Sequence, residues 1–124
     1  MRDFRELKVW RRAHKLALDL YEETGRFPKH EMYGLTQQIR RAAVSIAANI
    51  SEGAGKNSRP DFARFLQISL GSSSEVEYEL LLAHELGYLS LESHKKLTAH
   101  VVETKRMLTG FIQYLNGVRT GTHG

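Results

Sequence analysis

The stretch DFARFLQISLGSSSEVEYELLLAHEL, residues 61–86, decides the fold of this chain. Its apolar and small side chains recur at steps of three and four residues, which is the spacing of one helix face and not the alternation of a strand. The positions on this seam are Phe62, Leu66, Ser69, Ser73, Val76, Leu80, Ala83 and, just beyond, Gly87. The stretch therefore predicts a long amphipathic helix that packs against other helices.

Three further segments show the same spacing, and turn residues separate all four. The expected helices cover about residues 4–24, 34–52, 61–86 and 91–117. The other three core seams are expected at Leu7, Trp10, His14, Ala17, Tyr21 and Thr24; at Leu35, Ile39, Ala42, Ile46, Asn49 and Gly53; and at His94, Leu97, Val101, Thr104, Leu108, Phe111 and Leu115. Both prolines, Pro28 and Pro60, fall in the intervening loops.

Short connections near residues 53–60 and 87–90 turn each helix back against the one before it. The predicted fold class is all-α, an up-and-down antiparallel four-helix bundle in one domain over 1–117, followed by a flexible tail over 118–124. Asp61 and Ser90 are expected to cap the third and fourth helices, because their side-chain oxygens accept hydrogen bonds from free amides. Gly87 is expected to end the third helix.

The first helix carries a second apolar stripe beside its expected seam. This stripe consists of Val9, Ala13, Leu16 and Leu20. Spacing alone leaves two interpretations open. The stripe either widens the core face of the helix or contacts another copy of the chain.

Composition excludes several classes of protein. The 124 residues include no cysteine, which excludes disulfides, thiolate zinc sites and cysteine nucleophiles. No apolar run approaches the roughly 20 residues of a membrane helix, so we expect a cytoplasmic protein without membrane contact. The net charge of +4 is uneven, because residues 61–89 carry one basic and five acidic side chains. Such asymmetry can attract a polyanion or join basic and acidic faces of identical chains.

A line of polar side chains follows the second and third expected helices. Its members are Gln38, Arg41, Ser45, Asn49, Ser72, Glu75 and Glu79. If the two helices pair about a loop near residue 57, Arg41 comes close to Ser72 and Glu75, where its planar fork suits a two-pronged carboxylate contact. The line is interpreted either as a half-buried network that fixes helix register or as the lining of a small-molecule or catalytic pocket formed by Arg41, Glu75 and Glu79.

A basic line on the first helix is the candidate nucleic-acid contact. It consists of Arg5, Lys8, Arg11, Arg12 and Lys15. Basic residues near a helix start oppose the helix dipole, which favours acids there, and backbone phosphates need only positive charge. The alternative interpretation is a solvated face of an amphipathic helix.

No catalytic residue, metal site or cofactor is expected. Di-iron bundles use Glu-x-x-His pairs, and no glutamate here is followed three residues later by a histidine. The arginine-to-histidine spacing of small helical RNA-cleaving bundles is also missing from the sequence. The segment SEGAGKNS, residues 51–58, lacks the spacing of a phosphate-binding loop. We therefore expect a protein that is not an enzyme.

Four motifs in a fixed order resemble one known family. They are FRELKVWRRAHKLALDLY (4–21), FPKHEMYGL (27–35), QIRRAAVSIAANISEG (38–53) and SRPDFARFLQISLGSSSEVEYELLLAHELGYL (58–89). Together they resemble the bacterial four-helix-bundle family encoded in intervening sequences of 23S rRNA genes. That family is in turn similar to the accessory variability protein of diversity-generating retroelements, which forms a ring of five beside a reverse transcriptase.

The resemblance implies a four-helix bundle that assembles with itself, as a homopentamer. It also implies a role beside RNA or DNA, or beside an enzyme that acts on nucleic acid. The expected function is thus a non-enzymatic scaffold or adaptor that binds nucleic acid through basic surfaces. The alternative is a module that binds only proteins.

Overall fold

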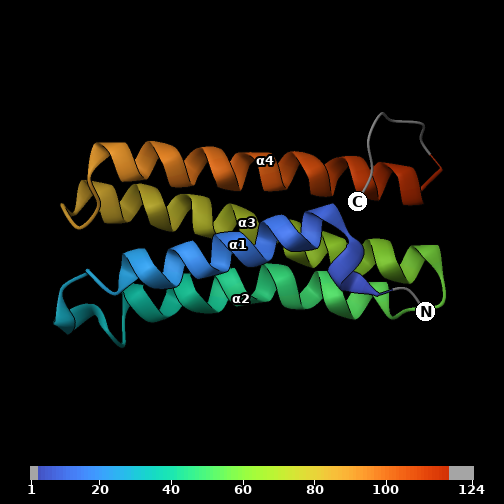
Figure 1. Cartoon of the computed structure of the whole chain (residues 1–124), viewed down its shortest axis with the longest axis horizontal. Helices are drawn as coiled ribbons and strands as arrows, with labels where there is room; N and C mark the ends of the chain where they lie inside the picture. Colours follow the sequence, from blue (N-terminus) through green and yellow to red (C-terminus); the bar gives the residue numbers. More distant parts are fainter. Residues whose placement is uncertain (1–2, 118–124) are drawn as a thin grey trace.

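The computed structural model describes residues 3–117, which form four long helices and two short 3₁₀ turns. The elements in chain order are η1 (Phe4–Glu6), α1 (Lys8–Thr24), η2 (Lys29–Glu31), α2 (Leu35–Ala54), α3 (Arg59–Glu85) and α4 (Leu91–Leu115). The four α-helices are nearly parallel rods whose directions alternate along the chain (Figure 1). The predicted antiparallel four-helix bundle is confirmed. The expected tail, 118–124, lies outside the described residues.

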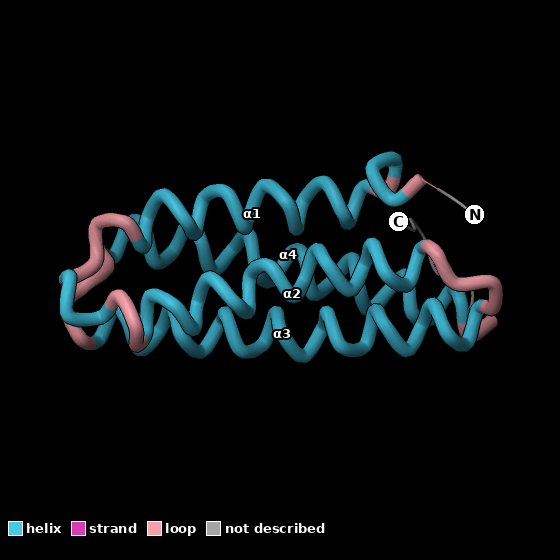
Figure 2. The backbone as a smooth tube through the Cα atoms, turned by 90° about the horizontal axis from the view of Figure 1, so that it is seen from below, coloured by secondary structure: helices cyan, strands magenta, loops and turns pink. Residues whose placement is uncertain are grey.

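The helices are arranged so that each packs against the next in the chain, and α1 closes the bundle against α4. Consequently α1 and α3 occupy diagonal corners. The α1–α2 and α3–α4 connections lie at one end of the bundle, and the α2–α3 turn lies at the other (Figure 2). Within residues 3–117, no helix has the length and apolar character needed to span a bilayer.

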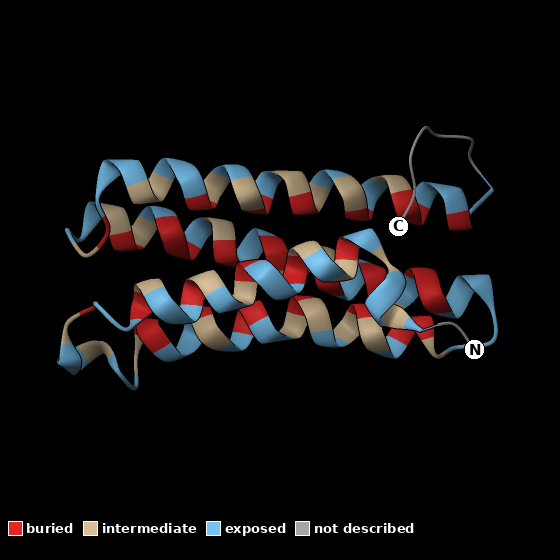
Figure 3. Cartoon of the chain, in the orientation of Figure 1, coloured by how far each residue is buried: buried red, intermediate tan, exposed pale blue. Residues whose placement is uncertain are grey.

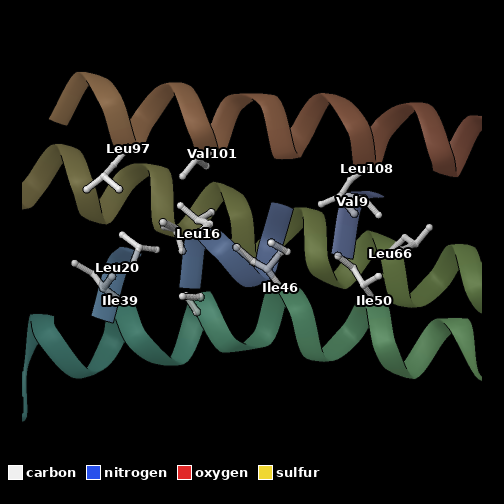
Figure 4. Packing of buried hydrophobic residues seen from close by; sticks show 14 of the residues in the cluster. Val9, Leu16, Leu20, Ile39, Ile46, Ile50, Leu66, Leu97, Val101 and Leu108 are labelled. Atoms are coloured by element: carbon white, nitrogen blue, oxygen red, sulfur yellow. The ribbon is translucent and has the colours of Figure 1, made fainter. Parts of the chain in front are cut away.

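Aliphatic side chains from all four helices fill the interior. Figure 3 shows buried residues as a stripe along each helix, facing the other helices. Ile46 of α2, Leu66 of α3 and Leu108 of α4 are almost wholly buried and point into one shared core (Figure 4). The seams predicted for α2, α3 and α4 are buried except at three positions: the half-buried Asn49 and His94 and the exposed Gly87.

The seam predicted for the first helix is wrong at most of its positions: Thr24 is buried as expected, whereas Leu7, Trp10 and Ala17 are only half-buried against the core. The buried stripe of α1 consists of Val9, Ala13, Leu16, Leu20 and Thr24. His14 and Tyr21, which were expected in the core, are exposed. The reason is chemical, because purely aliphatic side chains suit the dry interior whereas these rings carry polar atoms that stay near water. The second apolar stripe is therefore the core face and not a contact with another copy.

The ends of α3 and α4 show which capping predictions hold. Ser90 caps α4, since its Oγ accepts from the amide of Ser93 at 3.1 Å. Gly87 has φ +84°, the left-handed conformation that glycine adopts beyond a helix end. The predicted cap Asp61 is wrong, because Ser58 is the N-cap and accepts from the Asp61 amide at 3.2 Å. Pro60 is tolerated inside the first turn, where amides have no intrahelical partner.

Candidate functional site

The predicted basic line lies at the start of the chain, and two of its five members already have carboxylate partners. Arg5 lies in η1, before α1 begins, and pairs with Asp3 at 3.2 Å. Lys15 pairs with Asp19 at 2.6 Å, and this hydrogen bond raises the pKa of Lys15. Both pairs are solvent-accessible, so they reduce the local positive field only partly.

The other three cations, Lys8, Arg11 and Arg12, form no ion pair with a carboxylate of residues 3–117. Arg12 nevertheless lies near Glu103, whose pKa is lowered first by the hydrogen bond from Arg106 and also by the charge of Arg12. The Arg11 guanidinium instead donates to the carbonyl oxygens of Arg5, at 2.9 Å, and Glu6, at 3.3 Å. These bonds hold the side chain in place across η1 without neutralising it. The first two turns of α1 therefore present fixed positive charge.

The basic surface at the start of α1 ends where α1 packs against α4. Arg12 is half-buried there, and burial together with the charge of Arg12 lowers the pKa of His100. Further along, α1 and α4 border an open groove of about 210 Å³. Its charged lining consists of Asp19, Glu22, Glu23, Arg26, Glu92 and Lys96. Because acids outnumber bases in this groove, its local charge is negative, unlike that of the start of α1.

The polar line between α2 and α3 forms direct hydrogen bonds at its centre. The hydroxyls of Ser45 and Ser72 lie 2.8 Å apart. Asn49 Nδ2 donates to the Ser45 carbonyl at 2.9 Å and to its hydroxyl at 3.1 Å. Ser69 donates to the carbonyl of Ile46 at 2.8 Å. The Ser45–Ser72 and Ser69–Ile46 hydrogen bonds cross from one helix to the other and fix their register, whereas Asn49 holds the Ser45 hydroxyl from within α2.

The same line opens into a shallow groove at its Arg41 end. The groove has a volume of about 270 Å³ and is lined by Gln38, Arg41, Ala42, Ser45, Ser72 and Glu75. Arg41 and Glu75 both line it, yet the expected two-pronged contact is not formed, and Arg41 has no ion pair with any described carboxylate. A positive and a negative side chain thus border the groove without neutralising each other.

Glu79, one helical turn beyond Glu75, differs from the rest of the line because it is buried. Only 3% of its surface is exposed, and its Oε1 has no hydrogen-bond partner. Burial, and after it the neighbouring Glu75 carboxylate, raises the pKa of Glu79 to about 8. Glu79 is therefore mostly protonated at neutral pH. The sequence places this residue on the polar line but gives no sign of its protonation, which depends on burial.

Two histidines lie beside the turn between α3 and α4, His84 near the end of α3 and His94 near the start of α4. The rings of His84 and His94 stack with centroids 4.8 Å apart, and His84 Nδ1 lies 2.8 Å from the Leu89 carbonyl. Tyr88 donates to Glu31 at 2.8 Å, which ties the two loops at this end together. Among residues 3–117, no cluster of three or more histidine or carboxylate side chains is arranged to hold a metal ion.

Comparison with known proteins agrees with this architecture. The sequence model of the family described as 23S rRNA-intervening sequence protein matches residues 5–110. A crystal structure of a protein of unknown function from the S23 ribosomal protein family of Bacteroides thetaiotaomicron is similar, with a TM-score of 0.79 and 26% identity. The similarity covers 85% of this chain and 95% of that one. No curated protein matches the chain.

Proposed function

Because the chain belongs to the 23S rRNA-intervening sequence protein family, we propose that it is a non-enzymatic, homo-oligomeric scaffold or adaptor that binds nucleic-acid backbone through the start of α1. The proposal places the protein in the cytoplasm. It also takes the assembly to be a ring of five, on the resemblance to the accessory variability protein of diversity-generating retroelements. RNA, DNA or an enzyme that acts on them is the proposed partner.

The observation that supports this proposal is the cluster of Lys8, Arg11 and Arg12, none of which forms an ion pair with a carboxylate of the described chain. The first turn of α1 contains no acid, although the helix dipole favours acids there by about 0.3–1 kcal/mol each. A basic helix start therefore lowers the stability of the isolated chain. Phosphate groups relieve that repulsion, and they need no base-reading geometry to do so.

The test is a salt titration of binding to labelled RNA and DNA oligonucleotides, followed by fluorescence anisotropy. The wild-type chain is compared with Lys8→Gln/Arg12→Gln/Lys15→Gln, which leaves the hydrogen bonds of Arg11 intact. The matched control, Lys95→Gln/Lys96→Gln/Arg106→Gln, removes the same charge from α4. We expect the α1 variant alone to lose affinity, with the slope of log K against log salt falling by about 0.9 per lost phosphate contact.

Equal losses of RNA and DNA affinity in the two variants would show that binding depends only on net charge, and would contradict a binding site on α1. The oligomer is tested separately by light scattering, where we expect a mass near five times the 14.1 kDa chain.

A module that binds only proteins is the second candidate. It is favoured by the large apolar side chains that the described surface exposes, among them Tyr33, Tyr78 and Leu91. Absence of measurable RNA and DNA binding at low salt would favour this candidate over the first.

A further inference from the structure

A row of flat side chains lies beside the cations at the start of α1. Trp10, the one tryptophan of the chain, packs against the ring of Phe4, with centroids 4.9 Å apart and planes at 64°. The ring of His14 stacks on Trp10, with centroids 4.8 Å apart and planes only 9° from parallel. Phe4, Trp10 and His14 therefore form a continuous aromatic row. At its Phe4 end, the Arg5 guanidinium lies 4.7 Å from the centre of the ring.

Packing against the core accounts for one end of the aromatic row and not for the other. Phe4 and Trp10 are half-buried and pack against the core. His14 is exposed, and among residues 3–117 it makes no hydrogen bond, no ion pair and no ring contact except the one with Trp10. No described ring covers the imidazole face opposite Trp10, so the row can be extended by one more flat group.

Positive charge lies next to this open end of the row. Residues three and four apart are neighbours on a helix surface, which puts Arg11 beside His14 on the exposed side of α1. The Arg11 guanidinium is held in place by the carbonyls of Arg5 and Glu6. Leu18, one turn beyond His14, is 56% exposed, so an apolar side chain and not an acid borders the far side. A nucleotide whose phosphate is bound by Arg11 can therefore place its base against His14.

We propose that the aromatic row is a stacking platform for an unpaired nucleobase, which makes single-stranded RNA or DNA the ligand of the basic start of α1. The inference rests on the nucleic-acid binding of the proposed function and adds the class of nucleic acid. A base inside a duplex already has neighbours on both faces, whereas an unpaired base offers a free face to an aromatic side chain. Stacking of this kind tolerates any sequence, because every base has such a face.

Charge favours a nucleotide over an aromatic side chain of a protein partner. Either group could stack on His14, but only the nucleotide brings a negative charge together with its flat ring. Lys8 and Arg11 near the row have no carboxylate partner among the described residues, and phosphates supply the missing charge.

The experiment compares two substitutions of the same histidine. Binding is followed by fluorescence anisotropy of a labelled single-stranded oligonucleotide and of a duplex of the same length, as RNA and as DNA. His14→Gln removes the ring and keeps a polar side chain, whereas His14→Phe keeps a flat ring and removes the polar atoms. The matched control is His30→Gln, which changes another exposed histidine, in η2 at the opposite end of the bundle (Figure 1).

We expect His14→Gln to bind the single strand at least about 5-fold more weakly than wild type, because loss of one base stack weakens binding by roughly 5- to 150-fold. Its affinity for the duplex should stay unchanged. His14→Phe and His30→Gln should keep the wild-type affinity for both. Trp10 supplies a second measurement, since unlabelled single strand, unlike duplex, should change its fluorescence in the wild-type chain.

Wild-type affinity of His14→Gln for the single strand, or an equal loss in His14→Phe, would overturn the stacking platform. An equal loss for the duplex would do the same, and each of these results leaves a phosphate contact at the start of α1 standing. Displacement of the single strand by adenosine monophosphate at equal nucleotide concentration would assign the row to free nucleotides instead of a strand. Absence of binding to both single strand and duplex would remove the nucleic-acid function itself.

Discussion

Glu79 makes the stability of the bundle depend on pH in a direction that can be worked out. Its pKa is about 8 in the folded chain, against 4.5 for an ordinary glutamate side chain. Between these values the folded state holds a proton that the unfolded state has released, so the free energy of unfolding decreases as pH rises through this window. At about 1.4 kcal/mol for each pKa unit, the loss is roughly 3 kcal/mol at pH 7 and approaches about 5 kcal/mol above pH 8.

Glu79→Gln isolates this contribution, because glutamine has nearly the same shape and does not ionise. Urea unfolding is followed by circular dichroism for both chains at pH 5 and pH 8. We expect the two chains to differ little at pH 5, and the variant to be more stable by about 4 kcal/mol relative to wild type at pH 8. All other ionisable groups are the same in both chains, so their contribution cancels in the difference.

The control is Glu85→Gln, an exposed position on the same helix, which should show no pH-dependent difference from wild type. A Glu79→Gln chain whose stability differs from wild type by the same amount at both pH values would refute the argument. It would mean that Glu79 is ionised in the folded chain and has found a partner or water.

Two further predictions concern packing. Gly53→Ala should destabilise the chain by about 1–3 kcal/mol in thermal or urea unfolding, because the added Cβ would lie 2.8 Å from Phe62 Cδ1. Gly55→Ala is its control, since no atom lies closer than 3.6 Å to the added Cβ there. Leu16→Ala should cost about 2–5 kcal/mol, whereas Leu18→Ala, at a 56% exposed position, should change stability by less than about 0.5 kcal/mol. Equal effects at Leu16 and Leu18 would contradict the core stripe of α1.

The core face of a helix can be predicted from the sequence where its apolar residues form a single stripe. In α3 the positions from Phe62 to Ala83 repeat without a competing stripe, and all of them are buried. In α1 two stripes lie side by side, and periodicity cannot rank them. The polarity of the side chains decides between the two stripes. Leu16 and Leu20 lose no hydrogen bonds on leaving water, whereas the Tyr21 hydroxyl and the His14 ring nitrogens do.

The N-cap predicted for α3, Asp61, is also wrong. The expectation that Pro60 lies in a loop is wrong, because Pro60 stands in the first turn of α3, where there are no amide hydrogen bonds for a proline to break. Ser58 thus takes the N-cap position, and Asp61 becomes an acid of the first turn, where the dipole favours it.

The candidate site was harder to predict, because its chemistry depends on distances that spacing does not fix. The expected pairing of the second and third helices brings Arg41 near Glu75, and both line one groove. Residue spacing does not determine side-chain rotamers, so it cannot distinguish a two-pronged ion pair from two separate charges. Likewise the protonation of Glu79 follows from burial of the carboxyl beside a second carboxylate, a property of the packed helices and not of the sequence pattern.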